Sequence, residues 1–374
     1  MRLPFPFPLA TLIRFPVDLK NHSVLNSSIS HPNIACKYYR NWKEFGKICC
    51  GKGMKLFDSH CHLQDPRIYH LAPQIIRTAL DSGVLHFAVN GVSEEDWTMV
   101  KQMDEQYHCI VPCFGLHPWY VAERSPNWLN SLRNFFETTP WAAVGEIGLD
   151  KGLRGKEINF TDQVQVFHQQ LELAKWLQRP VSVHCVRAFG DLLEILQSAG
   201  PFPAGVILHS YLGSAEMVPE LAKLGAYFSF SGYLMSIKPQ KAKRMLKLVP
   251  TERILLESDA PDALPKSNLD SLFWIHRDGS GPQELLSGGN LASGVVDPFH
   301  SLPHASRDAS ALPKGTLNHP ANIHSVLTYV ASLLEMQEED LAEISYRNAV
   351  ALFSYDGSKV LRKETETMIP EATA

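Results

Sequence analysis

The sequence predicts a (β/α)₈ TIM barrel with an N-terminal extension and a long insertion after strand eight. From residue 55 onward, short apolar runs alternate with longer amphipathic stretches, which is the pattern of repeated βα units. Eight strand-like runs can be distinguished, whereas an open doubly wound sheet usually has fewer. Metal-binding residue types stand at the ends of many of these runs, and barrels form their active sites at the carboxyl ends of strands.

The predicted strands are short runs rich in β-branched and aromatic residues. They span residues 55–58, 85–89, 110–114, 142–146, 181–184, 206–209, 227–230 and 254–257. Among the helices predicted between them are residues 160–177 and 215–224, and two further helices, 323–335 and 339–353, complete the barrel.

Three segments are expected to lie outside the regular barrel of residues 54–357. Residues 1–53 are rich in Pro, Ser and Asn, and we interpret them as a targeting segment, a disordered tail or an upstream start of no consequence. Residues 270–317, crowded with Gly, Ser, Pro and His, predict a flexible insertion that is either a lid or a solvated loop. Residues 358–374 form a C-terminal tail.

Composition limits the possible functions. The net charge is −4, but residues 1–53 hold eight basic and two acidic residues, which leaves −10 for the remainder. Such an acidic body does not suit general coating of nucleic acid. No apolar run is long enough to predict a membrane span. Seven cysteines without a CxxC pair indicate reduced thiols and an intracellular protein, of cytoplasm or nucleus, with organelle targeting by residues 1–53 as an alternative.

The first predicted strand carries a candidate metal-binding motif. Strand alternation predicts that Asp58, His60 and His62 face the barrel interior while Ser59 and Cys61 point the other way. One HxH motif is weak evidence for a metal site, because buried histidines are common in protein cores. Further candidates stand at or just after other strands: His117, Glu146, His184, His209 and Asp259.

The number of candidate ligands suggests two ions. Three imidazoles or carboxylates suffice for one hydrolytic metal, and His60, His62, His184 and His209 with Glu146 and Asp259 are twice that number. Glu146 is the natural bridging carboxylate. Two bridged ions stabilise both the attacking and the leaving oxygen, which suits phosphodiester hydrolysis. Zn²⁺, Mn²⁺ and Mg²⁺ are all compatible with these ligands.

Taken together, these motifs resemble the TatD-type metal-dependent deoxyribonucleases of the amidohydrolase-like barrels. The matching segments are 58–63 (DSHCHL), 115–118 (GLHP), 145–150 (GEIGLD), 183–188 (VHCVRA), 209–214 (HSYLGS), 257–261 (ESDAP) and 347–349 (RNA). The resemblance covers about residues 55–355, apart from the insertion. Related barrels that hydrolyse C–N bonds often carry a carbamylated lysine where Glu146 stands, which favours the TatD branch.

The resemblance implies a site and a reaction. His60 and His62 would bind the first ion with Asp259, Glu146 would bridge, and His184 and His209 would bind the second. It also implies DNA cleavage, often as a 3′-to-5′ exonuclease, with Mg²⁺ as the usual cofactor. One departure is residues 317–322 (LNHPAN), where the family usually carries Arg and Glu before the Pro-Ala-Asn. If those side chains orient substrate or support a metal ligand in the family, that function is altered in this chain, where His319 precedes the Pro-Ala-Asn.

Several other residues have two interpretations each. Arg187 and His117 are predicted to hold a phosphate, with a structural salt bridge as the alternative for Arg187. Asp259 is predicted to be both ligand and base, with ligation alone as the alternative. Asp58 and Glu257 are expected to orient imidazoles, and Cys61 and Cys185 to be structural. The basic cluster Lys238, Lys241, Lys243, Arg244 and Lys247 is either a solvated helix face or a guide for nucleic acid.

We therefore predict a two-metal deoxyribonuclease in which Glu146 and Asp259 are the catalytic residues and DNA is the substrate. The alternatives are a hydrolase of another ester, such as aminoacyl-tRNA, and a metal-binding scaffold without catalysis. No protein partner can be deduced from the sequence.

Overall fold

The computed structural model describes residues 53–267, 272–275 and 315–360. The predicted N-terminal extension, most of the predicted insertion and the chain beyond residue 360 lie outside the described residues.

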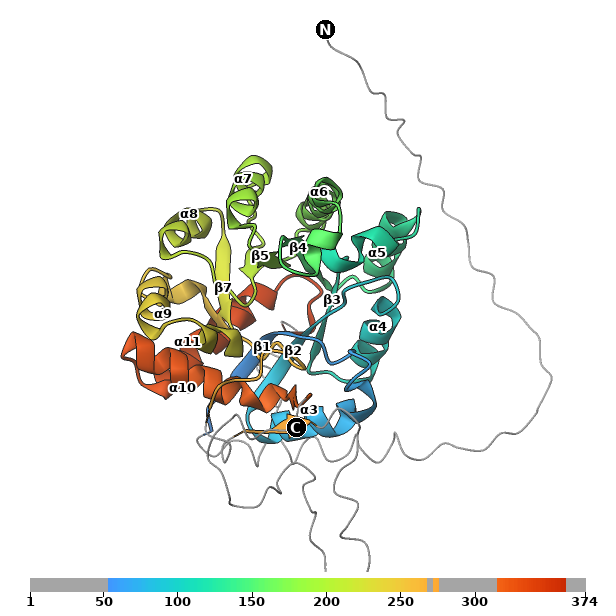
Figure 1. The fold of residues 1–374 in the computed structure, drawn as a ribbon. Helices are drawn as coiled ribbons and strands as arrows, with labels where there is room; N and C mark the ends of the chain where they lie inside the picture. The colour runs from blue at the N-terminus through green and yellow to red at the C-terminus, as the bar shows by residue number, and fades with distance from the viewer. Residues whose placement is uncertain (1–52, 268–271, 276–314, 361–374) are drawn as a thin grey trace, which may run out of the picture. The chain divides into compact units, whose positions relative to one another are not determined.

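Eight parallel strands pair in sequence order, each with the next along the chain (Figure 1). They are β1 Leu56–Cys61, β2 Val84–Asn90, β3 Ile110–Phe114, β4 Ala143–Asp150, β5 Val181–Val186, β6 Val206–Leu208, β7 Ala226–Phe230 and β8 Ile254–Leu256. Just beyond β8 the chain returns to β1, because Asp259 N donates to His60 O (3.0 Å) and His62 N donates to Ala260 O (2.7 Å). The predicted barrel is confirmed, nearly closed and with all eight strands.

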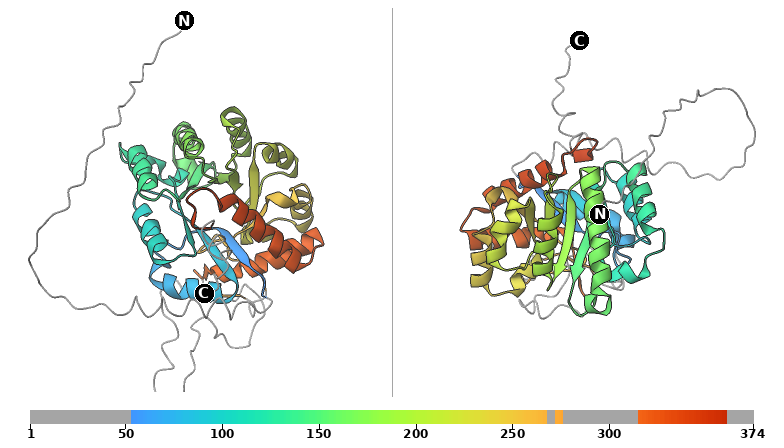
Figure 2. Two further views of the ribbon diagram at one scale, coloured as in Figure 1. Left: turned by 180° about the vertical axis from the view of Figure 1, so that it is seen from behind. Right: turned by 90° about the horizontal axis from the view of Figure 1, so that it is seen from above.

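Helices surround these strands (Figures 1 and 2). They are α3 Ala72–Asp81, α4 Trp97–Gln106, α5 Trp128–Thr138, α6 Phe160–Leu177, α7 Phe189–Ala199, α8 Val218–Lys223, α9 Pro239–Leu246, α10 Ile323–Leu334 and α11 Glu338–Phe353. Short 3₁₀ helices occupy Tyr69–Leu71, Pro118–Glu123, Gly155–Glu157, Ala215–Met217, Gly232–Ser236, Thr251–Arg253 and Pro320–Asn322. The helix predicted over residues 215–224 thus begins as a 3₁₀ turn, because Pro219 has no N–H to donate to Ala215.

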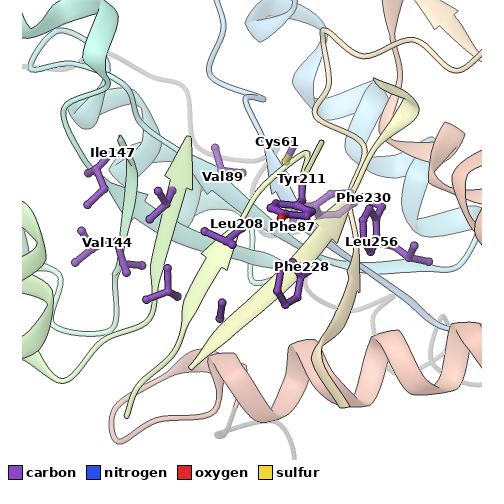
Figure 3. Close-up of a cluster of buried hydrophobic side chains, with 14 of the residues drawn as sticks. Cys61, Phe87, Val89, Val144, Ile147, Leu208, Tyr211, Phe228, Phe230 and Leu256 are labelled. Carbon is purple, nitrogen blue, oxygen red and sulfur yellow. The ribbon is translucent and has the colours of Figure 1, made fainter. Parts of the chain in front are cut away.

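The main core lies between the strands and the helices. Outward-facing strand residues such as Val144, Ile147, Leu208 and Phe228 are buried among helix side chains (Figure 3). Each large apolar side chain removed from water contributes roughly 1.5–3 kcal/mol. This layer stabilises the barrel from outside, so that polar side chains can occupy part of its interior.

A second, smaller core fills the amino-terminal end of the barrel interior. Helix α11 places Phe353 against Phe57 of β1, with the rings stacked and their centroids 5.1 Å apart. Asn348 Nδ2 of the same helix donates to Ile254 O (3.0 Å) at the start of β8. Figure 2 shows α11 lying across this end of the barrel.

The two ends of the predicted insertion meet. Strand β9 (Trp274–Ile275) pairs antiparallel with β10 (Leu317–Asn318), and Asn318 N donates to Pro261 O (2.8 Å). The ends of the insertion therefore lie beside the segment that follows β8. Within the described residues, none of the helices is both long and apolar enough to span a bilayer.

The predicted alternation of β1 is wrong at one point. Ser59 Oγ reaches Ser229 Oγ of β7 (2.7 Å), so it faces the interior, while Asp58 turns to Ser258 beside β8. The register of β1 against β2 shifts between Asp58 and Cys61. An irregularity of this kind adds a residue to one strand and resets the alternation, so Ser59 and His60 both point inward.

Candidate metal centre

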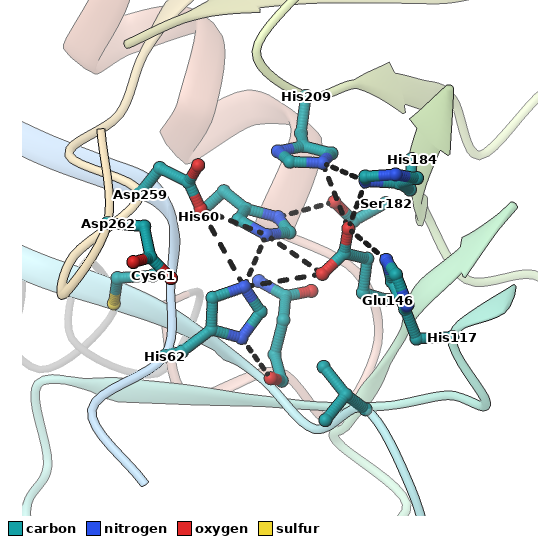
Figure 4. Close-up of polar contacts among 12 residues, drawn as sticks. His60, Cys61, His62, His117, Glu146, Ser182, His184, His209, Asp259 and Asp262 are labelled. Carbon is teal, nitrogen blue, oxygen red and sulfur yellow. Dashed lines mark hydrogen bonds and ion pairs between the residues drawn. The ribbon is translucent and has the colours of Figure 1, made fainter. Parts of the chain in front are cut away.

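Glu146, near the middle of β4, lies at the centre of the predicted site residues (Figure 4). Its side chain is almost fully buried. One carboxylate oxygen faces the histidines that lie on or directly follow β1, and the other faces histidines that follow or lie on β3, β5 and β6. Glu146 thus lies between two groups of histidines, and its bridging role stays a prediction.

The first group of ligand candidates comes from the two strands where the barrel closes. Glu146 Oε2 lies 3.5 Å from His60 Nε2 and 3.3 Å from His62 Nε2. Asp259 Oδ1 lies 3.9 Å and 3.7 Å from the same two nitrogens. Three side chains of this group, His60, His62 and Asp259, bring one ligand atom each close enough to share an ion.

The second group lies on the other side of Glu146. Glu146 Oε1 lies 2.9 Å from His209 Nε2, 3.0 Å from His184 Nδ1 and 3.4 Å from His117 Nε2. His117, Glu146 and His184 also bring ligand atoms close enough to share an ion. The structure thus brings His117, predicted to contact substrate, against the Glu146 carboxylate itself.

Each of the four predicted ligand histidines has its outer ring nitrogen beside an oxygen. His60 Nδ1 contacts Ser182 Oγ (2.8 Å) and His62 Nδ1 contacts Asn90 O (2.8 Å). His184 Nε2 contacts Asp150 Oδ2 (3.2 Å), and His209 Nδ1 lies 3.5 Å from Glu257 Oε1. Such outer contacts fix the orientation and tautomer of metal-binding imidazoles.

For two of the site histidines the contacts indicate which nitrogen of a neutral ring carries the proton. A carbonyl only accepts hydrogen bonds, so neutral His62 donates outward to Asn90 O and turns a lone pair toward the centre. His184 has a carboxylate oxygen beside each nitrogen, Asp150 at Nε2 and Glu146 at Nδ1, and can donate to either. His117 has the opposite arrangement to His62, because its Nδ1 accepts from Trp119 N (3.2 Å). Neutral His117 therefore presents an N–H to the centre.

The inward nitrogens fit a bound cation. His60 Nε2 and His62 Nε2 lie 3.2 Å apart, and His184 Nδ1 and His209 Nε2 lie 3.1 Å apart. Two lone pairs at such distances repel unless a proton or cation lies between them. Nitrogens bound to one ion at about 2.1 Å are themselves roughly 3.0–3.4 Å apart at right or tetrahedral angles. The donor set and its spacing therefore fit a divalent metal ion.

Protons compete with a cation for these sites. Burial opposes protonation of His62, but Glu146 outweighs burial and raises the pKa of His62 to about 9. Burial likewise opposes protonation of His209, yet Glu146 holds its pKa well above the ordinary value. Burial lowers the pKa of His60 and of His117 to about 4. Burial also raises the pKa of Asp259 to about 7, near the range of a useful general base.

Sharp turns at the mouth place the last of these residues. Arg187, Ser210 and Asp259 follow β5, β6 and β8, and each has a left-handed backbone, with φ of 54°, 43° and 51°. Non-glycine residues adopt this conformation uncommonly, and mostly in tight turns and at helix ends. Gly148 in β4 also has positive φ (146°), and a Cβ there would overlap the His184 carbonyl. The glycine therefore lets β4 approach β5 beside a ligand.

Three groups that position the ligands were not predicted. Asp150 stands within the predicted motif at residues 145–150, but nothing in the sequence pairs it with His184. Ser182 is two residues before His184, a spacing that could have marked it as inward-facing. The Asn90 carbonyl belongs to the backbone and leaves no sequence signal.

Glu257 and Asp58, expected to orient imidazoles, have different surroundings. Glu257 Oε1 accepts from Ser210 N (2.7 Å) and lies beside His209. Asp58 instead accepts from Ser258 N (2.8 Å) and Ser258 Oγ (2.5 Å). Because Ser258 precedes Asp259, Asp58 supports the backbone of a ligand rather than an imidazole ring.

The altered segment before α10 also braces the Asp259 turn. Asn318 Nδ2 donates to Ser258 O (2.9 Å). His319 is fully buried and caps the 3₁₀ helix Pro320–Asn322, its Nδ1 accepting from Ala321 N (3.0 Å). His319 is therefore a structural residue one step removed from the centre.

The predicted basic residues have separate locations. Arg187 is exposed after β5, and among the described residues we find no carboxylate paired with it. On and after α9, Lys243 and Lys247 pair with Glu335, and Arg244 pairs with Glu216. These three side chains thus have the carboxylate partners expected of a solvated helix face.

The sequence matches the family model described as TatD related DNase over residues 57–354. The chain belongs to the TatD family. The predicted assignment to a metal-dependent hydrolase of the TatD type is thereby confirmed.

Several curated proteins align with this TatD chain. The metal-dependent hydrolase YabD of Bacillus subtilis is 27% identical over 80% of this chain and 98% of its own. The 3′-5′ ssDNA/RNA exonuclease TatD of a Pantoea species is 29% identical over 56% of this chain and 81% of its own. The human deoxyribonuclease TATDN3 is 27% identical over 59% of this chain and 84% of its own.

Solved structures share the fold of this TatD chain. The TatD homologue YjjV of Escherichia coli superposes with a TM-score of 0.63 at 23% identity, over 80% of this chain and 98% of the other. A TatD-family hydrolase of Entamoeba histolytica gives a TM-score of 0.61 at 18% identity, over 81% and 99%.

Proposed function

We propose that this TatD-family hydrolase is a nuclease that cleaves DNA phosphodiester bonds with two divalent ions. The observation that carries the proposal is Glu146, whose two carboxylate oxygens separately face the two groups of ligand candidates. A carboxylate shared in this way is typical of two-metal hydrolases that act on phosphate esters. Two relatives named as an exonuclease and a deoxyribonuclease support the same substrate class.

We assign the ligands to the two ions as the family resemblance implies. His60, His62 and Asp259 would hold the first ion, His184 and His209 the second, and Glu146 both. Divalent ions there, with Mg²⁺ the first choice and Mn²⁺ or Zn²⁺ also compatible, would supply Lewis acidity toward the phosphate and the attacking water.

Asp259 is the residue best suited to accept a proton. It stands at the mouth, is 5% exposed and contacts both β1 histidines. As water attacks phosphorus, one of its protons passes to the Asp259 carboxylate, the P–O bond to the leaving oxygen breaks, and that oxygen takes up a proton from solvent.

His117 is the residue best suited to contact the phosphate. Its inward N–H, fixed by the Trp119 contact, is a hydrogen-bond donor among lone pairs and carboxylates. A neutral donor held this way can stabilise charge on a non-bridging oxygen without moving. Arg187, exposed after β5, is a second candidate for a phosphate contact.

The test is cleavage of single-stranded DNA labelled at its 3′ or 5′ end by the purified full chain. Mg²⁺ or Mn²⁺ is added after EDTA stripping. We expect ion-dependent shortening that falls about a thousandfold in Glu146→Gln, and the two labels give the polarity. A protein that takes up two ions yet leaves both labels intact would contradict DNA as substrate, and aminoacyl-tRNA would be tested next. A chain that takes up no ion would contradict the two-metal mechanism itself.

A further inference from the structure

Arg154 occupies a distinctive position beside the second ligand group. It lies on the loop between β4 and α6, and its guanidinium carbon is 4.4 Å from the centre of the Trp119 ring and 5.4 Å from that of Tyr120. Trp119 in turn lies against the site, with ring centroids 4.7 Å from His117 and 5.9 Å from His184. Arg154 is therefore one aromatic ring away from the ligand candidates.

Trp119 is held firmly enough to position this arginine. Its Nε1 donates to Asp150 Oδ2 (2.6 Å), the same oxygen that contacts His184 Nε2. The indole thus cannot rotate without breaking a contact that also orients a ligand candidate. A guanidinium stacked on such a ring loses less freedom when it binds a ligand.

The N–H groups of Arg154 remain available. Stacking uses the face of the guanidinium, whereas its donors lie in the plane. Within the part of the chain that the structure describes, we find no carboxylate or carbonyl bonded to Arg154, and the side chain is exposed. Two neighbouring cations differ: Lys151 pairs with Asp191 (2.7 Å) and Arg124 with Asp162 (2.7 Å).

A polyanionic substrate needs such a cation here. Residues 54–374 carry a net charge of −10. Except where cations are bound, this part of the chain therefore repels nucleic acid. The metal centre accounts for one phosphate only. Of the basic cluster near α9, Lys243, Arg244 and Lys247 already pair with carboxylates.

We propose that Arg154, supported by Trp119, binds a backbone phosphate next to the one that is cleaved, in a single-stranded nucleic acid. The proposal rests on the proposed nuclease function and adds a subsite to it. The guanidinium fork matches two phosphate oxygens, and its exposed face can stack on a nucleobase. A substrate with a single phosphate would not reach this subsite.

The test compares two substrates in the full chain with Mg²⁺ or Mn²⁺. One is a short single-stranded oligodeoxynucleotide and the other is bis(p-nitrophenyl) phosphate, which has one phosphate. We expect Arg154→Gln to lower kcat/KM about tenfold on the oligonucleotide, and less than twofold on the small diester. The dependence of log KM on log salt should also become shallower by about 0.7. Lys151→Gln removes the same charge from the same loop and serves as the control. It should change neither the kcat/KM on the oligonucleotide nor the salt dependence of KM.

Binding gives a readout that does not need cleavage. Fluorescence anisotropy of a labelled oligonucleotide in Mg²⁺, with both proteins also carrying Glu146→Gln to stop cleavage, should show about tenfold weaker binding to the Arg154→Gln protein than to the protein that keeps Arg154. A wild type that cleaves while Arg154→Gln keeps its affinity and its oligonucleotide kinetics would overturn the subsite alone. Equal losses on both substrates would also overturn it, because they indicate a disturbed centre. A wild type that cleaves neither substrate refutes the proposed nuclease function. Anisotropy then still tests the subsite. The subsite is refuted if the protein with Arg154 does not bind the oligonucleotide, or if the Arg154→Gln protein binds it equally well.

Discussion

The two ends of the barrel interior are lined by the same strands but differ completely in chemistry. At the amino-terminal end, Phe57 and Leu255 form a dry core closed by Phe353 of α11. At the carboxyl end, the interior holds His60 and Glu146, buried and in contact with one another. Stability and chemistry are therefore separated along the barrel axis, as is general for this fold.

The difference is also one of electrostatic cost. Burying Phe353 is favourable by itself, whereas burying Glu146 costs free energy unless its charge is compensated. The histidines around Glu146 hold its pKa well below the ordinary value despite burial, so the carboxylate stays charged. A cluster of this kind is stable when protons or cations neutralise it.

Loss of the apolar end should give the largest effect. Phe353→Ala removes the ring stacked on Phe57 and leaves a cavity, which should lower the free energy of unfolding by about 3–5 kcal/mol. Turnover per folded molecule should stay within about twofold, since Phe353 lies at the end away from the site. Urea denaturation and active-site titration measure the two quantities. Leu248→Ala, at a position 44% exposed, is the control and should cost less than about 0.5 kcal/mol.

An intermediate effect is expected at the polar end from a residue that touches no ligand atom. Asp150→Asn weakens the contact that orients His184, which should lower ion affinity or kcat by about 10–100-fold. Calorimetric titration with Mn²⁺ and steady-state kinetics would measure these effects. Asp191→Asn changes an exposed carboxylate of the next loop and serves as the control. Equal ion affinity and equal kcat in Asp150→Asn would show that His184 needs no such support.

The barrel itself was predictable because its signals are local and repeated. Each strand is a short apolar run, and the order of ligand-type residues at strand ends indicated which face is the mouth. The irregularity in β1 was not predictable, because it depends on how Asp58 and Ser59 are bonded to neighbouring strands. Strict alternation therefore placed Ser59 on the wrong face.

Roles within the site depended on three-dimensional contacts. The ligand candidates could be named from strand ends, but the N–H of His117 that faces Glu146 follows from a backbone contact with Trp119. The Arg154 subsite likewise depends on a loop that approaches an indole from another βα unit. Spacing in sequence carries no information about such contacts between units.

A smaller effect should separate the site histidines from the buried His319. Burial lowers the pKa of His319 to about 3, against an ordinary value of 6.5. Above pH 6.5 the ring is neutral in both the folded and unfolded chain, so it does not affect stability. As pH falls below 6.5, the unfolded chain binds a proton that the folded chain refuses, and the folded state is progressively destabilised.

His319→Asn should remove that pH dependence and keep the helix cap, since Asn is a good capping residue. Between pH 7 and pH 5 the wild type should lose about 2 kcal/mol more stability than the variant, at about 1.4 kcal/mol per pH unit below 6.5. Urea denaturation of both proteins in EDTA at the two pH values measures this difference, because the ligand histidines titrate equally in each. The same pH-dependent loss in both proteins would mean that folding does not depress the pKa of His319. A smaller loss in the variant would instead show that the residue replacing the usual family pattern before α10 makes the fold sensitive to acid through its burial, independently of the metal centre.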